Sequence, residues 1–131
     1  MWQEARLLCA HIDEACEVIA SKRNYGLVDQ MRRSAISIPS NISEGFDRRS
    51  PASFRYFLLV AKGSAAELRS QLYLCLDRGY LAPSSVDMLQ QQCEAVSQML
   101  WGLIRYLEQL IQPQRGQPTW NAERGTRNPP T

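Results

Sequence analysis

The side chains suited to catalysis or metal binding are few in this 131-residue chain: one histidine, His11, and four cysteines, Cys9, Cys16, Cys75 and Cys93. The cysteines form no CxxC pair, and a lone histidine cannot complete the four-ligand set that zinc usually takes. No glycine-rich loop able to cradle a phosphate is present. We therefore expect no catalytic site, no metal, no cofactor and no enzyme activity, and we interpret the cysteines as reduced residues of an apolar core.

Positive charge is concentrated between residues 22 and 79, where ten Lys and Arg residues stand against five Asp and Glu residues. The net charge of +2 conceals this basic middle because residues 1–21 and 80–112 are acidic. Guanidinium groups bind phosphate through paired hydrogen bonds, so the pattern indicates nucleic-acid binding. The predicted contacts are Arg32, Arg33, Arg48, Arg49, Arg55, Lys62 and Arg69. The same side chains could instead pair with the acidic segments, and both interpretations stay open.

The strongest local signal for phosphate is the pair Arg48–Arg49, which stands directly before Ser50 and Pro51. A serine followed by proline is a helix start: the hydroxyl caps the helix, and proline tolerates the first helical position. The free N–H groups of a helix N-terminus attract anions, so two arginines beside them could seat a phosphate. Such binding reads no bases and weakens steeply with salt.

Helical periodicity accounts for most of the chain, with helices predicted at about 3–21, 25–46, 51–78 and 85–112 and a flexible tail at 113–131 that contains Trp120. No alternating run predicts a strand. The expected fold is all-α, an antiparallel up-down-up-down four-helix bundle in residues 1–112. The seam of the fourth helix is predicted to be Val86, Leu89, Cys93, Val96, Leu100, Leu103, Leu107 and Leu110.

The third predicted helix is apolar on more than one side, which exceeds what a four-helix monomer can bury. We therefore expect a homo-oligomer in which small residues let a neighbouring backbone approach. The predicted interface residues are Tyr56, Leu59, Val60, Gly63 and Ala66. No apolar run is long enough to cross a membrane and the N-terminus is not a signal peptide, so we expect a cytoplasmic protein.

Pro39 interrupts the second predicted helix, where it removes one backbone hydrogen bond and crowds the carbonyl of Ala35. Two interpretations are possible: one kinked helix, or a second short helix capped by Ser37. The apolar stepping keeps its phase across the proline, which favours the kinked helix. Ser37, Ser40 and Asn41 could then bond the backbone groups left free at the bend.

Two stretches, "QMRRSAISIPSNISEG" and "RYFLLVAKGSAAELRSQLYLCLDRGYL", resemble the four-helix-bundle proteins encoded in intervening sequences of bacterial 23S rRNA genes. That family includes the accessory variability proteins of diversity-generating retroelements. The resemblance covers about residues 5–112. Its first motif comprises Ser37, Pro39, Ser40, Asn41, Glu44 and Gly45.

The resemblance implies a bundle that assembles as a ring-like or barrel-like homo-oligomer, expected to be a pentamer. It also implies nucleic acid, structured RNA or DNA, and a reverse transcriptase as partners. We expect a non-enzymatic nucleic-acid-binding protein. The alternative is an oligomeric adaptor that holds a protein partner without affinity for nucleic acid.

Overall fold

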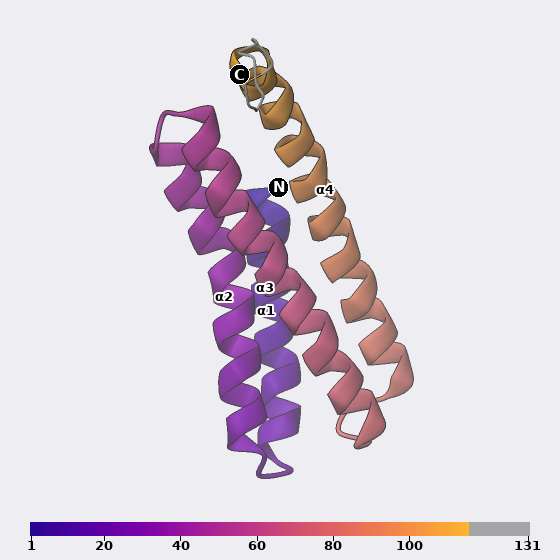
Figure 1. Cartoon of the computed structure of the whole chain (residues 1–131). Helices are drawn as coiled ribbons and strands as arrows, with labels where there is room; N and C mark the ends of the chain where they lie inside the picture. Colours follow the sequence, from indigo (N-terminus) through magenta and orange to yellow (C-terminus); the bar gives the residue numbers. More distant parts are fainter. Residues whose placement is uncertain (116–131) are drawn as a thin grey trace, which may run out of the picture.

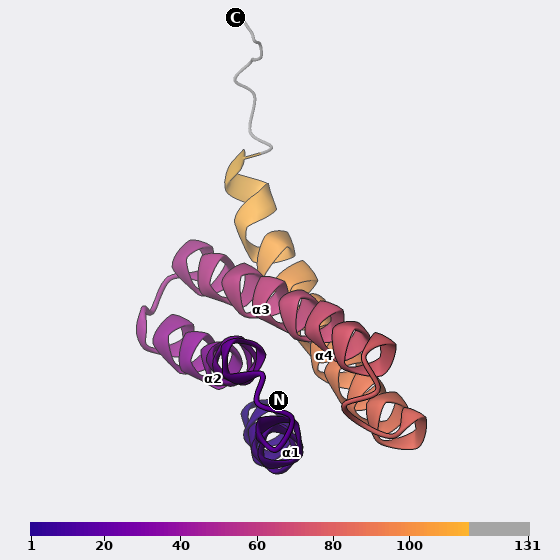
Figure 2. The same ribbon diagram turned by 90° about the horizontal axis from the view of Figure 1, so that it is seen from below.

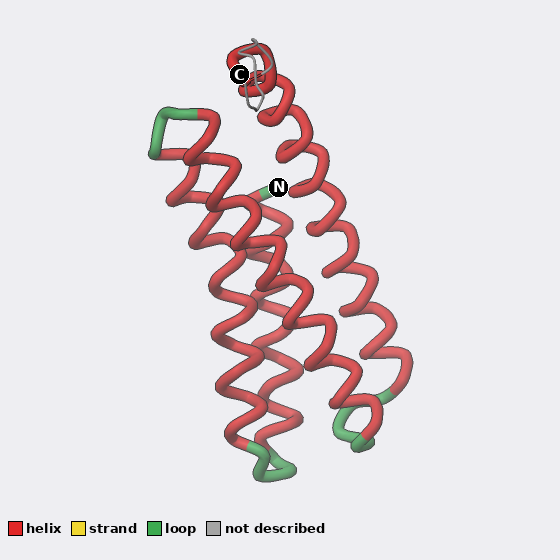
Figure 3. The backbone as a smooth tube through the Cα atoms, viewed as in Figure 1, coloured by secondary structure: helices red, strands yellow, loops and turns green. Residues whose placement is uncertain are grey.

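The computed structural model describes residues 1–115, which form four α-helices joined by short turns (Figure 1). The helices are α1 (Trp2–Ala20), α2 (Tyr25–Asp47), α3 (Pro51–Asp77) and α4 (Pro83–Arg115). No strand occurs in this range. The α1–α2 and α3–α4 turns lie at one end and the α2–α3 turn at the other (Figure 3), so successive helices run antiparallel. The predicted all-α four-helix architecture is confirmed.

Helix α4 continues to Arg115, three residues past the predicted end at 112. Residues 116–131, which include Trp120 and most of the predicted tail, lie outside the described residues. None of the helices in residues 1–115 is long and apolar enough to span a bilayer.

Short polar residues set the ends of the helices. The Asn24 side chain accepts a hydrogen bond of 3.1 Å from the backbone N–H of Leu27, and the Ser50 hydroxyl accepts one of 3.1 Å from Ser53. Gly79 ends α3 with a φ of +68°, a left-handed conformation that glycine adopts without steric cost. These caps keep the connections short and fix the antiparallel order.

The core is one apolar cluster to which every helix contributes. Its fully buried large side chains include Leu8, Ile12, Met31, Ile38, Leu58, Leu68, Leu72, Leu100 and Ile104. In α4 the predicted seam is wrong at Leu103, which is half-buried beside the buried Ile104, and at Leu110, which is 47% exposed. Leu107 is buried as predicted. A straight helix turns every 3.6 residues and drifts from a strict heptad pattern, so the buried face moves by one residue.

The four helices do not close the bundle equally on all sides. Helix α2 packs along α3 and α3 along α4, whereas α1 and α4 touch over a much shorter part of their length (Figure 2). Helix α3 is packed between α2 and α4, with one outer face free.

Candidate nucleic-acid interface

Helix α2 continues through Pro39 from Tyr25 to Asp47, so the interpretation in which Ser37 starts a second helix is wrong. The Asn41 amide donates to the Ser37 carbonyl at 2.8 Å and to the Ser37 hydroxyl at 2.9 Å. The Ser64 hydroxyl of α3 lies 2.7 Å from the Ser37 hydroxyl. The two serines therefore link α2 to α3 two residues before the proline. Ser40 is exposed.

In a regular helix the carbonyl of Ala35 would accept a hydrogen bond from the N–H of residue 39. Because Pro39 has no N–H, this carbonyl has no helical partner. The Cys9 thiol of α1 donates to this oxygen at 3.1 Å. Desolvation, with a smaller contribution from Asp13, raises the pKa of the Cys9 thiol, so the thiol stays protonated at neutral pH and keeps its donor. Cys9, expected to be only a core residue, thus stabilises the proline site. Its pairing with a residue 26 positions away has no sequence signal.

Replacing Cys9 with alanine is expected to lower the free energy of unfolding by about 1–2 kcal/mol, because the Ala35 carbonyl loses its donor. Cys9→Ser keeps a donor at the same position and is expected to lose less than half as much. Urea denaturation of both variants, at one protomer concentration, measures the difference. Equal losses in the two variants would show that sulfur packing, and not the hydrogen bond, matters at this position.

Five of the seven predicted nucleic-acid contacts are paired with carboxylates in the folded chain. The pairs are Arg32–Asp13, Arg33–Asp29, Arg48–Glu44, Arg55–Glu108 and Arg69–Glu94. Three of these pairs cross between helices, where the acidic helices α1 and α4 meet the basic α2 and α3. Exposed pairs of this kind contribute about 0–1 kcal/mol each, so a phosphate can displace the carboxylate at small cost. Whether these residues bind nucleic acid stays a prediction.

Arg49 and Lys62 are the two members of the set with no carboxylate oxygen within 4.0 Å among residues 1–115. The Lys62 ammonium lies 5.5 Å from the centroid of the Trp101 ring, within reach of a cation–π interaction. Arg49 is exposed and has a φ of +64°, a left-handed conformation that is uncommon for arginine. Its guanidinium is the one most available to a phosphate in the turn before α3.

The turn that carries Arg49 is held in place by its neighbours. The Arg48 guanidinium pairs with Glu44 at 2.8 Å and stacks over the Phe57 ring at 4.9 Å. The Phe46 and Phe54 rings meet edge to face, with centroids 6.1 Å apart. Arg48 therefore joins α2 to α3. Of the two arginines, Arg49 is the one without a carboxylate partner among residues 1–115.

The predicted oligomer interface forms a continuous outer face of α3. All of its members are exposed: Tyr56, Leu59, Val60, Gly63 and Ala66. The opposite face of the same helix is buried, and its members include Leu58, Ala61, Ala65 and Leu68. Apart from the adjoining residues and the backbone of α3 itself, no atom of the described chain lies within 4 Å of the place that a Cβ at Gly63 would take, so this face is open to a neighbour.

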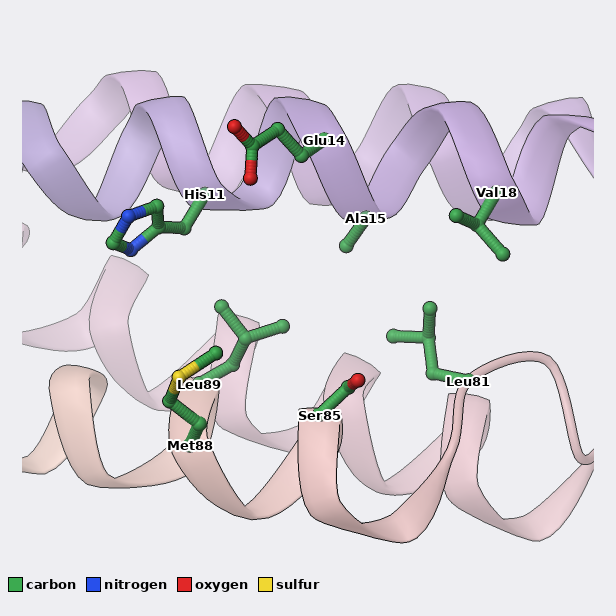
Figure 4. Close-up of a pocket in the computed structure, with 8 residues that line it drawn as sticks. All are labelled: His11, Glu14, Ala15, Val18, Leu81, Ser85, Met88 and Leu89. Atoms are coloured by element: carbon green, nitrogen blue, oxygen red, sulfur yellow. The ribbon is translucent and has the colours of Figure 1, made fainter.

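A cavity of about 300 Å³ lies between α1 and the start of α4 (Figure 4). His11 reaches from α1 toward α4, and Leu89 and Ser85 point from α4 toward α1, whereas the Glu14 carboxylate stays level with α1. The Nδ1 of His11 lies 3.0 Å from the Gln92 side-chain oxygen and 2.8 Å from its nitrogen, so the amide holds the ring. In residues 1–115 no group of three or more potential metal ligands comes together.

The fold and the motif around Pro39 define the class of protein: an antiparallel four-helix bundle whose second and third helices carry the basic residues. A family model described as "23S rRNA-intervening sequence protein" matches residues 1–102. The chain belongs to this family, and the resemblance of its sequence motifs is confirmed.

A solved structure supports the same fold. It is the crystal structure of a protein of unknown function from the S23 ribosomal protein family of Bacteroides thetaiotaomicron VPI-5482. The two chains share 20% identity with a TM-score of 0.76, and the alignment covers 79% of this chain and 96% of the other. At this level of identity the likeness concerns the fold alone. A search of curated proteins gave no significant match.

Proposed function

We propose that this chain is a non-enzymatic, oligomeric nucleic-acid-binding protein that contacts structured RNA, or an RNA–DNA hybrid, through the basic surface of α2 and α3. The observation that carries the proposal is Arg49. This arginine is exposed, has no carboxylate partner among residues 1–115, and precedes the Ser50-capped N-terminus of α3. A guanidinium beside a helix N-terminus suits a phosphate oxygen.

The oligomer supplies the rest of the affinity. One free arginine in a protomer is a weak site, but a ring repeats it in every subunit, and linked sites bind one nucleic acid with greater avidity. The exposed outer face of α3 supports such an assembly, for which we propose a homopentamer. All four cysteines are free thiols, which suits the reducing cytoplasm where we propose that the protein acts.

Arg49→Asn is expected to weaken binding to structured RNA by about tenfold or more at low salt. The slope of log affinity against log salt should fall by about one for each Arg49 that contacts a phosphate. Fluorescence anisotropy with a labelled RNA hairpin and a DNA duplex of equal length, each at two salt concentrations, measures both quantities.

The matched control is Arg23→Asn. Arg23 has the same φ of +64° and is also exposed, but it lies in the α1–α2 turn at the opposite end of the bundle. The two variants therefore lose the same charge and relieve the same backbone strain. Light scattering checks that both retain the oligomer. Equal losses of affinity would refute the Arg49 site.

The free apolar face of α3 also favours a second candidate, an oligomeric adaptor for a protein such as a reverse transcriptase. Failure of the unchanged protein to bind either nucleic acid at low salt would favour this candidate. Co-purification of a protein partner after nuclease treatment would then support it.

A further inference from the structure

An apolar groove of about 550 Å³ opens where α1 begins and α2 ends. Its walls include Trp2 of α1, Phe46 of α2, Phe54 of α3 and Leu103 of α4, and its one hydroxyl side chain is that of Ser43. The Phe46 side chain is 73% exposed and Trp2 is 41% exposed. Aromatic surface of this extent is unfavourable in water unless something covers it. The basic surface proposed above uses none of these four wall residues.

The chain itself supplies a suitable occupant beyond Arg115. Residues 116–131 contain one large apolar side chain, Trp120, among polar residues, glycines and prolines. The α4 wall of the groove, Leu103, lies twelve residues before Arg115, or about 18 Å along the helix. Residues 116–120 can span about 17 Å when extended, and the indole side chain adds to this reach.

We propose that the segment 116–122 folds back along α4 of its own chain and places the Trp120 indole in the groove between Trp2, Phe46 and Leu103. Two features of the groove suit an indole. Its aromatic walls can meet the ring face to edge, and the Ser43 hydroxyl can accept a hydrogen bond from the indole N–H. The segment would then cover the apolar end of the bundle next to the α2–α3 turn.

The test uses the full-length chain with Trp2→Phe, which keeps an aromatic wall at this position of the groove, and Trp101→Phe, so that Trp120 is the one tryptophan. Acrylamide quenching of its fluorescence is compared with that of a free peptide of residues 116–131. We expect at least threefold weaker quenching in the protein and emission shifted to shorter wavelength. Phe46→Ala in the same background should restore quenching to the level of the peptide, because it removes one wall of the groove.

Two further variants make the result specific. Ser43→Arg, at an exposed position, places a charge in the groove and should also release Trp120. Tyr73→Ala removes another exposed aromatic ring, from the part of α3 outside the groove, and should leave the quenching of Trp120 unchanged. Circular dichroism verifies that each variant folds. Quenching equal to that of the peptide, or protection that survives both groove variants, would overturn the proposal.

Discussion

Gly45→Ala is expected to lower the free energy of unfolding by about 1–3 kcal/mol, although alanine is the better helix former. A Cβ at this position would stand 2.9 Å from the Phe57 Cβ, 2.9 Å from the Phe54 ring and 3.3 Å from the Phe54 carbonyl oxygen. The Phe57 Cβ and the carbonyl are fixed to the α3 backbone, so α2 and α3 must move apart. Urea denaturation followed by circular dichroism, at one protomer concentration, measures the loss.

Gly102→Ala is the matched control for this variant. Gly102 is also a helical glycine, but it is exposed on α4, and nothing lies within 4 Å of the place that its side chain would take. The same chemical change is therefore expected to raise the free energy of unfolding there, by about 0.5–1 kcal/mol. A stability gain in both variants would show that α2 and α3 are not in close contact at Gly45.

The glycine also explains what the motif around Pro39 does in the fold. Ser37 bonds to Ser64 of α3, Gly45 admits the Phe54 and Phe57 side chains, and Glu44 holds Arg48. Each contact joins α2 to α3 or to the turn between them. The motif is thus a helix–helix junction that positions the turn carrying Arg49.

The helices could be predicted from the sequence because their signals are local. Ser50 and Pro51 mark the start of α3, and the apolar stepping through Pro39 indicates that α2 is one helix. The buried face of α4 was predicted correctly from Val86 to Leu100, where the 3.5-residue and 3.6-residue periods still agree. Beyond that point Leu107 is still buried as predicted, but the accumulated drift buries Ile104 in place of Leu103 and exposes Leu110.

The partners of the charged and sulfur groups could not be predicted, because they depend on how helices far apart in the sequence meet. Arg55 pairs with Glu108, 53 positions along the chain, and Arg69 pairs with Glu94. From the composition alone, the arginines of the basic segment could either pair with the acidic segments or contact phosphate. Only the packing of α3 against α4 shows that these two arginines are occupied while Arg49 is not.

Raising the pH from 8 to 11 is expected to destabilise the fold by several kcal/mol, because two thiols of the core resist ionisation. Desolvation raises the pKa of Cys93 from 9.0 to about 12, against the opposing effect of Arg69. Desolvation, with a contribution from Cys16, raises the pKa of Cys75 to about 11. Both side chains are 0% exposed.

The unfolded chain loses these protons first. The contribution of the two thiols to the free energy of unfolding is therefore fully present below pH 9 and is lost as the pH rises through the folded pKa values. At pH 11 each thiol costs about 2–3 kcal/mol, a large share of the stability of an ordinary domain.

The control for this pH dependence is the double variant Cys75→Ala/Cys93→Ala. Its free energy of unfolding should start lower at pH 8, because removing buried sulfur leaves small cavities, but it should fall less steeply between pH 9 and 11. The two proteins differ only at these two positions, so the difference between the two slopes isolates the thiols. Urea denaturation at half-unit steps of pH gives that difference, which approaches two protons, or about 2.7 kcal/mol per pH unit. Parallel curves would mean that the core opens enough to hydrate these thiols, and that α2, α3 and α4 pack less tightly around them than the structure shows.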